Sequence, residues 1–193
     1  MKQTSFQALL KKASFTIGDA RYYGIDPHVL SYYVNKGVLE RVARGVYRNP
    51  NVDSLVPFEW QDLFDVAQSI PNGIICLISA LSYYSLTQEI QRQFWIAVPH
   101  VFKAPKRPKT KIVRMRNVTL GRKSLKVGEC RTFIFDRERC VVDAFRFLSK
   151  ETALRALREY LKPSDQHKPD LSKLARYAKL LRVKIIPYIE ALT

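Results

Sequence analysis

The sequence predicts an α+β protein in which an N-terminal winged helix-turn-helix domain is followed by a mixed α+β C-terminal domain. Three observations predict this class. Helix-capping residues and glycines punctuate residues 1–37, and two short strand-like runs around a glycine follow. Beyond residue 57, strand-like and then helical segments succeed one another without regular alternation. The proline-bracketed polar segment 49–57 separates the two domains, which we place at residues 1–50 and 57–193.

The first two helices are predicted from apolar spacing and from capping residues. The apolar side chains of residues 6–10 recur at helical spacing. Thr16, with Asp19 three positions later, forms a capping-box pattern that opens a second helix over about Ile17–Tyr23. Gly24 then ends this helix.

A third helix has signals at both of its ends. Asp26 suits the N-cap and Pro27 the first helical position, while Gly37 suits the position just beyond a helix that ends near Lys36. Its apolar stripe is expected to pack inward and consists of Val29, Leu30, Tyr33 and Val34. Its other face is left to solvent and carries His28, Ser31, Tyr32, Asn35 and Lys36. Two helices joined by a short glycine-containing turn are the helix-turn-helix pattern.

The segment after the third helix predicts a wing. Residues 38–42 resemble a short strand, residues 43–45 a tight turn with Gly45, and residues 46–48 a return strand. Arg44 lies at the tip, with Arg41 and Arg48 beside it. An inserted helix reads base edges in the major groove, and wing arginines hold phosphates or the minor groove. We therefore predict DNA contacts at His28, Ser31, Tyr32, Asn35, Lys36, Arg41, Arg44 and Arg48.

An alternative interpretation of the same pattern stays open. Short three-helix units followed by a hairpin also serve as protein–protein modules, in which the paired tyrosines would simply be core residues. The excess of eight basic over three acidic side chains in residues 1–50 favours the DNA-binding interpretation.

A family resemblance rests on this segment. Its most specific part is the run from Gly37 to Arg48, which includes Arg44-Gly45-Val46-Tyr47-Arg48. Together with Phe15-Thr16 and Gly24-Ile25, it resembles the winged-helix domain of AbiEi-type antitoxins of bacterial abortive-infection (type IV) toxin–antitoxin systems. The resemblance implies a DNA-binding autorepressor of its own operon. In such systems the antitoxin also neutralises a nucleotidyltransferase-like toxin, without stable direct binding.

The remaining helices and strands are predicted from the hydrophobic periodicity and from residues that break helices or strands. Residues 57–70 predict an amphipathic helix, and residues 74–77 either a buried strand or the opening of the helix through Tyr84. Strands are expected at 94–98, 112–115, 125–127 and 132–135. Helices are expected at 139–148, 151–161, 171–181 and 185–192.

This second half resembles the AbiEi C-terminal domain more distantly. The segments that carry the resemblance are Ile78-Ser79-Ala80-Leu81, Val98-Pro99 and Phe135 to Arg146. Cys140 stands where the family commonly has threonine. The resemblance implies that antitoxin action resides in this domain.

Positive charge is concentrated in the middle of the chain. The formal net charge is +16, and residues 103–131 hold eleven basic side chains and one acidic side chain. Two interpretations stay open: a solvated loop, or a second phosphate contact continued by a strand that presents Arg114 and Arg116 on one face. This second basic patch comprises Lys103, Lys106, Arg107, Lys109, Lys111, Arg114 and Arg116.

Several function classes are disfavoured. No phosphate-cradling Gly-rich motif, nucleophile elbow or zinc-ligand spacing is present, so we expect no catalysis, cofactor or metal. Asp136, Glu138 and Asp143 could suggest a metal-dependent nuclease, but the interleaved arginines favour intrahelical ion pairs. The longest uncharged apolar stretch, 73–86, is too short to span a membrane. Three cysteines without a Cys-x-x-Cys pair indicate reduced thiols in a cytoplasmic protein.

These observations together predict a DNA-binding regulator. The preferred function is transcriptional autorepression through inverted repeats in the chain's own promoter, combined with the antitoxin role that the family resemblance implies. A regulator without an antitoxin role is the main alternative, and a metal-dependent nucleic-acid-processing enzyme is a further one.

Overall fold

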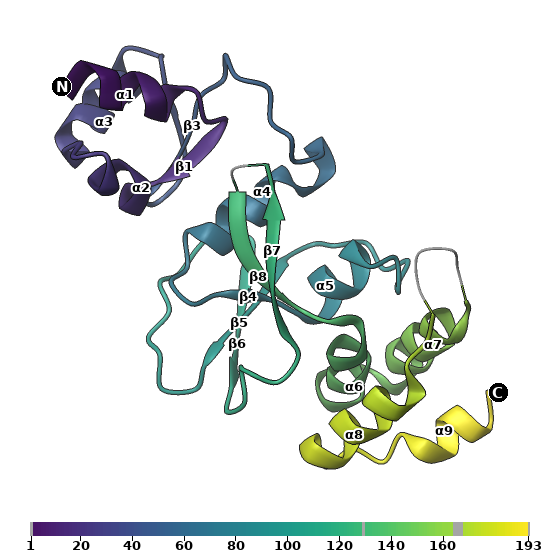
Figure 1. Cartoon of the computed structure of the whole chain (residues 1–193). Coiled ribbons are helices and arrows are strands. Elements are labelled where there is room, and N and C mark those ends of the chain that lie inside the picture. Colours follow the sequence, from purple (N-terminus) through teal and green to yellow (C-terminus); the bar gives the residue numbers. More distant parts are fainter. Residues whose placement is uncertain (1, 129, 164–167, 193) are drawn as a thin grey trace. The chain divides into compact units, whose positions relative to one another are not determined.

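The chain folds into two compact units. The computed structural model describes residues 2–128, 130–163 and 168–192 (Figure 1). The first unit contains Met1–Gly73, Pro105–Arg107 and Ser124–Thr132, and the second contains Ile74–Ala104, Pro108–Lys123 and Phe133–Thr193. Helices and a small antiparallel sheet at the N-terminus are followed by a mixed sheet with helices, so the predicted α+β class is confirmed. No helix in the described residues is long and apolar enough to cross a membrane.

The N-terminal part of the first unit is a winged helix (Figure 1). Its elements in chain order are α1 (Lys2–Leu10), β1 (Ser14–Thr16), α2 (Ile17–Tyr22), α3 (Pro27–Asn35), β2 (Glu40–Ala43) and β3 (Val46–Arg48). The strands form an antiparallel sheet in the order β1-β3-β2. Strand β1 was not predicted, because three residues are too few to show an alternating pattern and Thr16 also serves as the cap of α2.

The predicted caps are confirmed, and one of them moves a strand boundary. Thr16 and Asp19 form the capping box of α2, and Asp26 accepts a hydrogen bond from the backbone N–H of His28. Gly37 has φ +70°, and the amides of Gly37 and Val38 donate to the carbonyls of Val34 and Tyr33. This is a Schellman motif. Because it uses the residues after the helix, β2 begins at Glu40, and the strand predicted from residue 38 is wrong there.

The core of the winged helix is apolar and aromatic. Tyr47 of the wing stacks on Phe15 of β1 with ring centroids 5.9 Å apart. The buried members of this core are Leu9, Phe15, Ala20, Ile25, Leu30, Leu39 and Tyr47. Val29 is a correction to the predicted inward stripe of α3, since 40% of its surface is exposed. It precedes Leu30 by one residue, which turns it about 100° away from the buried centre of the stripe.

Helix α4 (Phe58–Gln68) also belongs to the first unit and is joined to the winged helix by a buried carboxylate. Asp65 of α4 pairs with Arg48 of β3 and accepts a hydrogen bond of 3.0 Å from the hydroxyl of Ser14 in β1. Burial raises the pKa of Asp65, although the charge of Arg48 and the hydrogen bond from Ser14 both lower it. The network therefore fixes both strands against α4.

A mixed five-stranded sheet has the order β6-β5-β4-β8-β7. Its strands are β4 (Ile74–Ile75), β5 (Phe94–Pro99), β6 (Thr110–Met115), β7 (Arg122–Val127) and β8 (Cys130–Phe135). Strand β4 is antiparallel to β5 and parallel to β8, while β5 and β6 are parallel. The alternatives for residues 74–77 are both realised, because the short strand β4 ends at Ile75 and α5 (Leu77–Tyr83) begins two residues later.

Four helices complete the second unit: α6 (Arg137–Phe147), α7 (Lys150–Leu161), α8 (Leu171–Leu181) and α9 (Ile186–Glu190). Helix α6 packs against α5, α7 and α8 (Figure 1). Asp136 caps α6 and Ser149 caps α7, so α6 begins two residues and α7 one residue before the predicted starts. The three cysteines are free and buried, as expected.

Candidate nucleic-acid interface

The outer face of α3 presents polar side chains to solvent. All five residues predicted to face outward, His28, Ser31, Tyr32, Asn35 and Lys36, are exposed. The ammonium group of Lys36 lies 5.7 Å from the ring centroid of Tyr32, which is 56% exposed. The opposite side of the helix is anchored by the fully buried Leu30. This face therefore carries both donors and acceptors of the kind that read base edges.

The wing presents two of its three arginines to solvent. Arg41 and Arg44 are exposed, and Gly45 at the tip has φ +80°, a conformation that glycine adopts without strain. Arg48 is different, because it is only partly exposed and pairs with Asp65 and, at 3.8 Å, with Asp62. Its guanidinium is therefore engaged with α4.

Arg107 of the predicted basic patch belongs to the first unit, together with the wing. Its Nε donates to the hydroxyl of Ser69 and its Nη2 to the carbonyl of Ser69, each at 2.9 Å. Ser69 is the C-cap of α4, and a cation at the carbonyl end of a helix is favourable. Helix α4 also packs against β2, which carries Arg41.

The charge of Arg107 is linked to the wing. Burial lowers the pKa of Arg107, and the charges of Arg44 and Arg41 lower it further. The charges of Arg41 and Arg44 thus act unfavourably on the guanidinium of Arg107, and a bound anion would offset this repulsion. No spacing pattern could predict this grouping, because residues 44 and 107 are far apart in the chain.

The remaining members of the basic patch are divided between the units. Lys106 belongs to the first unit, and Lys103, Lys109, Lys111, Arg114 and Arg116 belong to the second. All six are exposed. The ammonium group of Lys111 lies 3.9 Å from the ring centroid of Trp95, so it has an aromatic partner. Strand β6 ends at Met115, which places Arg116 beyond the strand that was expected to align it with Arg114.

The acidic residues considered for metal binding are neutralised by basic side chains. Asp143 pairs with Arg139 at 2.7 Å and with Arg146 at 2.6 Å, which confirms the intrahelical pairs expected there. The same expectation is wrong for Asp136 and Glu138, whose partner is Lys173 of α8, at 2.9 and 2.7 Å. Within the described parts of the chain, no group of three or more His, Cys, Asp or Glu side chains could hold a metal ion.

Hydrogen bonds complete this buried network in the second unit. The hydroxyl of Tyr160 donates to Glu138 at 3.0 Å, and that of Tyr177 donates to Asp136 at 3.1 Å. Burial alone would raise the pKa of Glu138, but the hydrogen bond and charge of Lys173 outweigh it and leave that pKa below its ordinary value.

Arg139 has a structural role. Its guanidinium is fully buried and donates to the carbonyls of Leu120 and Asn117 at 3.0 and 2.9 Å. It thereby holds the segment after β6 against α6.

Comparison with protein families identifies the winged helix. Residues 8–50 match the family described as transcriptional regulator, AbiEi antitoxin. This segment is therefore similar to an AbiEi regulator domain. The AbiEi match runs from α1 to just beyond β3 and so includes α3 and the wing, while residues 51–193 lie outside it. No curated protein matches the chain.

Proposed function

We propose that this AbiEi-family chain is a DNA-binding autorepressor that acts in the cytoplasm on inverted repeats in its own promoter. The observation that supports this most strongly is the exposed polar face of α3 beside a wing with exposed Arg41 and Arg44. Ser31 and Asn35 would contact base edges, and the wing arginines, joined by Arg107, would hold phosphates.

We further propose that the chain is the antitoxin of a type IV toxin–antitoxin system. The AbiEi match to residues 8–50 and the resemblance of the second half to the family's C-terminal domain support this role. The partner would be a nucleotidyltransferase-like toxin that is counteracted without stable direct binding.

Regulation without an antitoxin role is the second candidate, because the AbiEi match is confined to the DNA-binding part of the chain. A promoter-reporter strain tests repression, and co-expression with the nucleotidyltransferase-like protein of the same operon tests rescue of growth. Repression with rescue supports both proposals, and repression without rescue supports the second candidate. An Mg²⁺-dependent cleavage activity that is lost in Asp143→Asn would instead favour an enzyme.

A further inference from the structure

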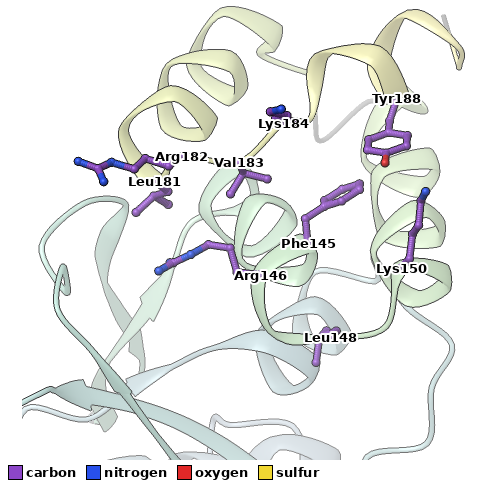
Figure 2. A pocket seen from close by; sticks show the side chains of 9 residues that line it. All are labelled: Phe145, Arg146, Leu148, Lys150, Leu181, Arg182, Val183, Lys184 and Tyr188. Atoms are coloured by element: carbon purple, nitrogen blue, oxygen red, sulfur yellow. The ribbon is translucent and has the colours of Figure 1, made fainter.

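A basic pocket lies in the second unit, and its lining includes none of the residues assigned to DNA binding. It has a volume of 620 Å³ and is formed by the end of α6, the start of α7 and the connection from α8 to α9 (Figure 2). Its lining consists of Phe145, Arg146, Leu148, Lys150, Leu181, Arg182, Val183, Lys184 and Tyr188. Four of these side chains are basic and none is acidic.

The four basic side chains are exposed and arranged around the pocket. Arg146 and Arg182 extend on one side of it, while Lys150 lies on the other side beside Tyr188 (Figure 2). Arg146 also pairs with Asp143, so its position is fixed by the buried network. Because the charges do not converge on one point, the pocket suits an extended polyanion better than a single phosphate.

Further basic side chains lie along α8, next to the part of the helix that lines the pocket. Arg176 and Lys179 are exposed and precede Arg182 at intervals of three residues, which places them along one ridge of the helix. An extended ligand that entered the pocket would therefore meet further cations beside it.

Arg182 occupies a backbone position that normally favours glycine. It ends α8 with φ +57°, while the amide of Val183 donates to the carbonyl of Ala178 at 2.8 Å. A left-handed conformation is unfavourable for a non-glycine residue. This left-handed residue ends α8 in the way that a helix C-terminus commonly ends, and Arg182 lines the pocket from that position.

An aromatic pair forms one wall. The rings of Phe145 and Tyr188 stack with centroids 5.4 Å apart, and the ammonium group of Lys150 lies 5.0 Å from the centroid of Tyr188. Because the two rings already contact each other, they do not form an open slot for a base. The ring of Tyr188 instead holds the ammonium group of Lys150 in place. A cation held in this way can contact a phosphate, so the wall favours a phosphate backbone over a stacked base.

We propose that this pocket binds the phosphate backbone of a nucleic acid, as a second site that is independent of the winged helix. Duplex DNA and RNA share this chemistry, and the experiment below distinguishes them. The site would contribute affinity and salt dependence but little sequence preference, because phosphate contacts carry no base information.

The test compares two full-length variants. Arg182→Gly with Lys184→Gln removes two pocket charges, and glycine relieves the left-handed backbone, so folding is retained. Arg92→Gln with Arg158→Gln removes two exposed charges of the same unit that do not line the pocket. Both are made in the Arg41→Ala/Arg44→Ala background, which removes wing contacts from the measurement and separates this proposal from that for the winged helix.

Fluorescence anisotropy with a non-operator DNA duplex and an RNA stem-loop, over a salt titration, gives the result. The pocket variant should bind one of these probes about 20-fold more weakly at 0.15 M salt, with a salt slope smaller by ~1.8, while the matched variant changes much less. The probe that loses affinity, the DNA duplex or the RNA stem-loop, shows which kind of nucleic acid the pocket binds. Equal affinity of the two variants for both probes would overturn the proposal.

Discussion

The winged helix and the C-terminal helices carry the same excess of positive charge but use it differently. Residues 1–50 hold eight basic and three acidic side chains, and residues 132–193 hold thirteen and eight, so each has a net charge of +5. In the winged helix, Arg41 and Arg44 are exposed. In the C-terminal helices, part of the positive charge is instead paired internally, because Arg139 and Lys173 satisfy buried carboxylates. Net charge alone therefore does not locate a nucleic-acid interface; exposure and pairing do.

The largest effect is expected at Lys173, where the comparison predicts a loss of stability. Lys173→Met leaves Asp136 and Glu138 buried without their cation, which should lower the free energy of unfolding by roughly 3–5 kcal/mol. Urea unfolding followed by circular dichroism measures it. The control Lys179→Met, at an exposed position of the same helix, should change stability by about 0.5 kcal/mol or less. Equal effects of the two variants would show that the network is not stabilising.

Arg48 tests whether an arginine of the wing that is paired with a carboxylate contributes to stability rather than to DNA binding. Arg48→Ala leaves the Asp65 carboxylate buried without a cation, so it should lower stability by about 2 kcal/mol while affecting DNA affinity less than Arg44→Ala does. Adding Asp65→Asn to Arg48→Ala should restore part of that stability. If Arg48→Ala instead lost DNA affinity without losing stability, its assignment to α4 would be wrong.

The exposed wing arginines should show the opposite behaviour. Arg41→Ala with Arg44→Ala should lower the affinity for promoter DNA about 25-fold at 0.15 M salt and reduce the salt slope by ~1.8, since two phosphate contacts are lost. The melting temperature should hardly change. Arg107→Gln should add a further loss, because Arg107 lies with these two residues. An unchanged salt slope would place the wing away from the phosphate backbone.

The smallest effect concerns acid pH. Because the folded-state pKa of Glu138 lies below its ordinary value of 4.5, its stabilising contribution is complete above that value and is lost as the pH falls below it. Glu138→Gln should flatten this part of the stability profile, measured by urea unfolding between pH 7 and pH 3. The raised pKa of Asp65 has the opposite sign, so that group favours the folded state as the pH falls. A wild-type profile without an acid limb would contradict the account of Glu138.

Much of the winged helix could be predicted from the sequence because its signals are local. The caps at Thr16 and Asp26 and the glycine at position 37 each act within a few residues of the helix end that they define. Strand β1 could not be predicted, since its partner β3 is about thirty residues away and its own length is three residues.

The long-range contacts of charged residues could not be predicted from the sequence either, because their partners are also far away in the chain. Lys173 contacts carboxylates that precede it by more than thirty residues, and Arg107 meets Ser69 across a similar interval. Nothing in the local pattern distinguishes these cations from exposed ones. The exposed face of α3 could be predicted, because helical periodicity separates it from Leu30.

The most direct test of the central claim is the ratio of affinities for promoter DNA and for a scrambled duplex, measured with the full-length chain. Ser31→Ala with Asn35→Ala should reduce this ratio at least tenfold, because each base-edge contact is worth about 1–3 kcal/mol. Arg41→Ala with Arg44→Ala should weaken binding to both duplexes alike and leave the ratio nearly unchanged. An unchanged ratio in the α3 variant would contradict the account, because the exposed face of α3 would then not be the surface that reads sequence.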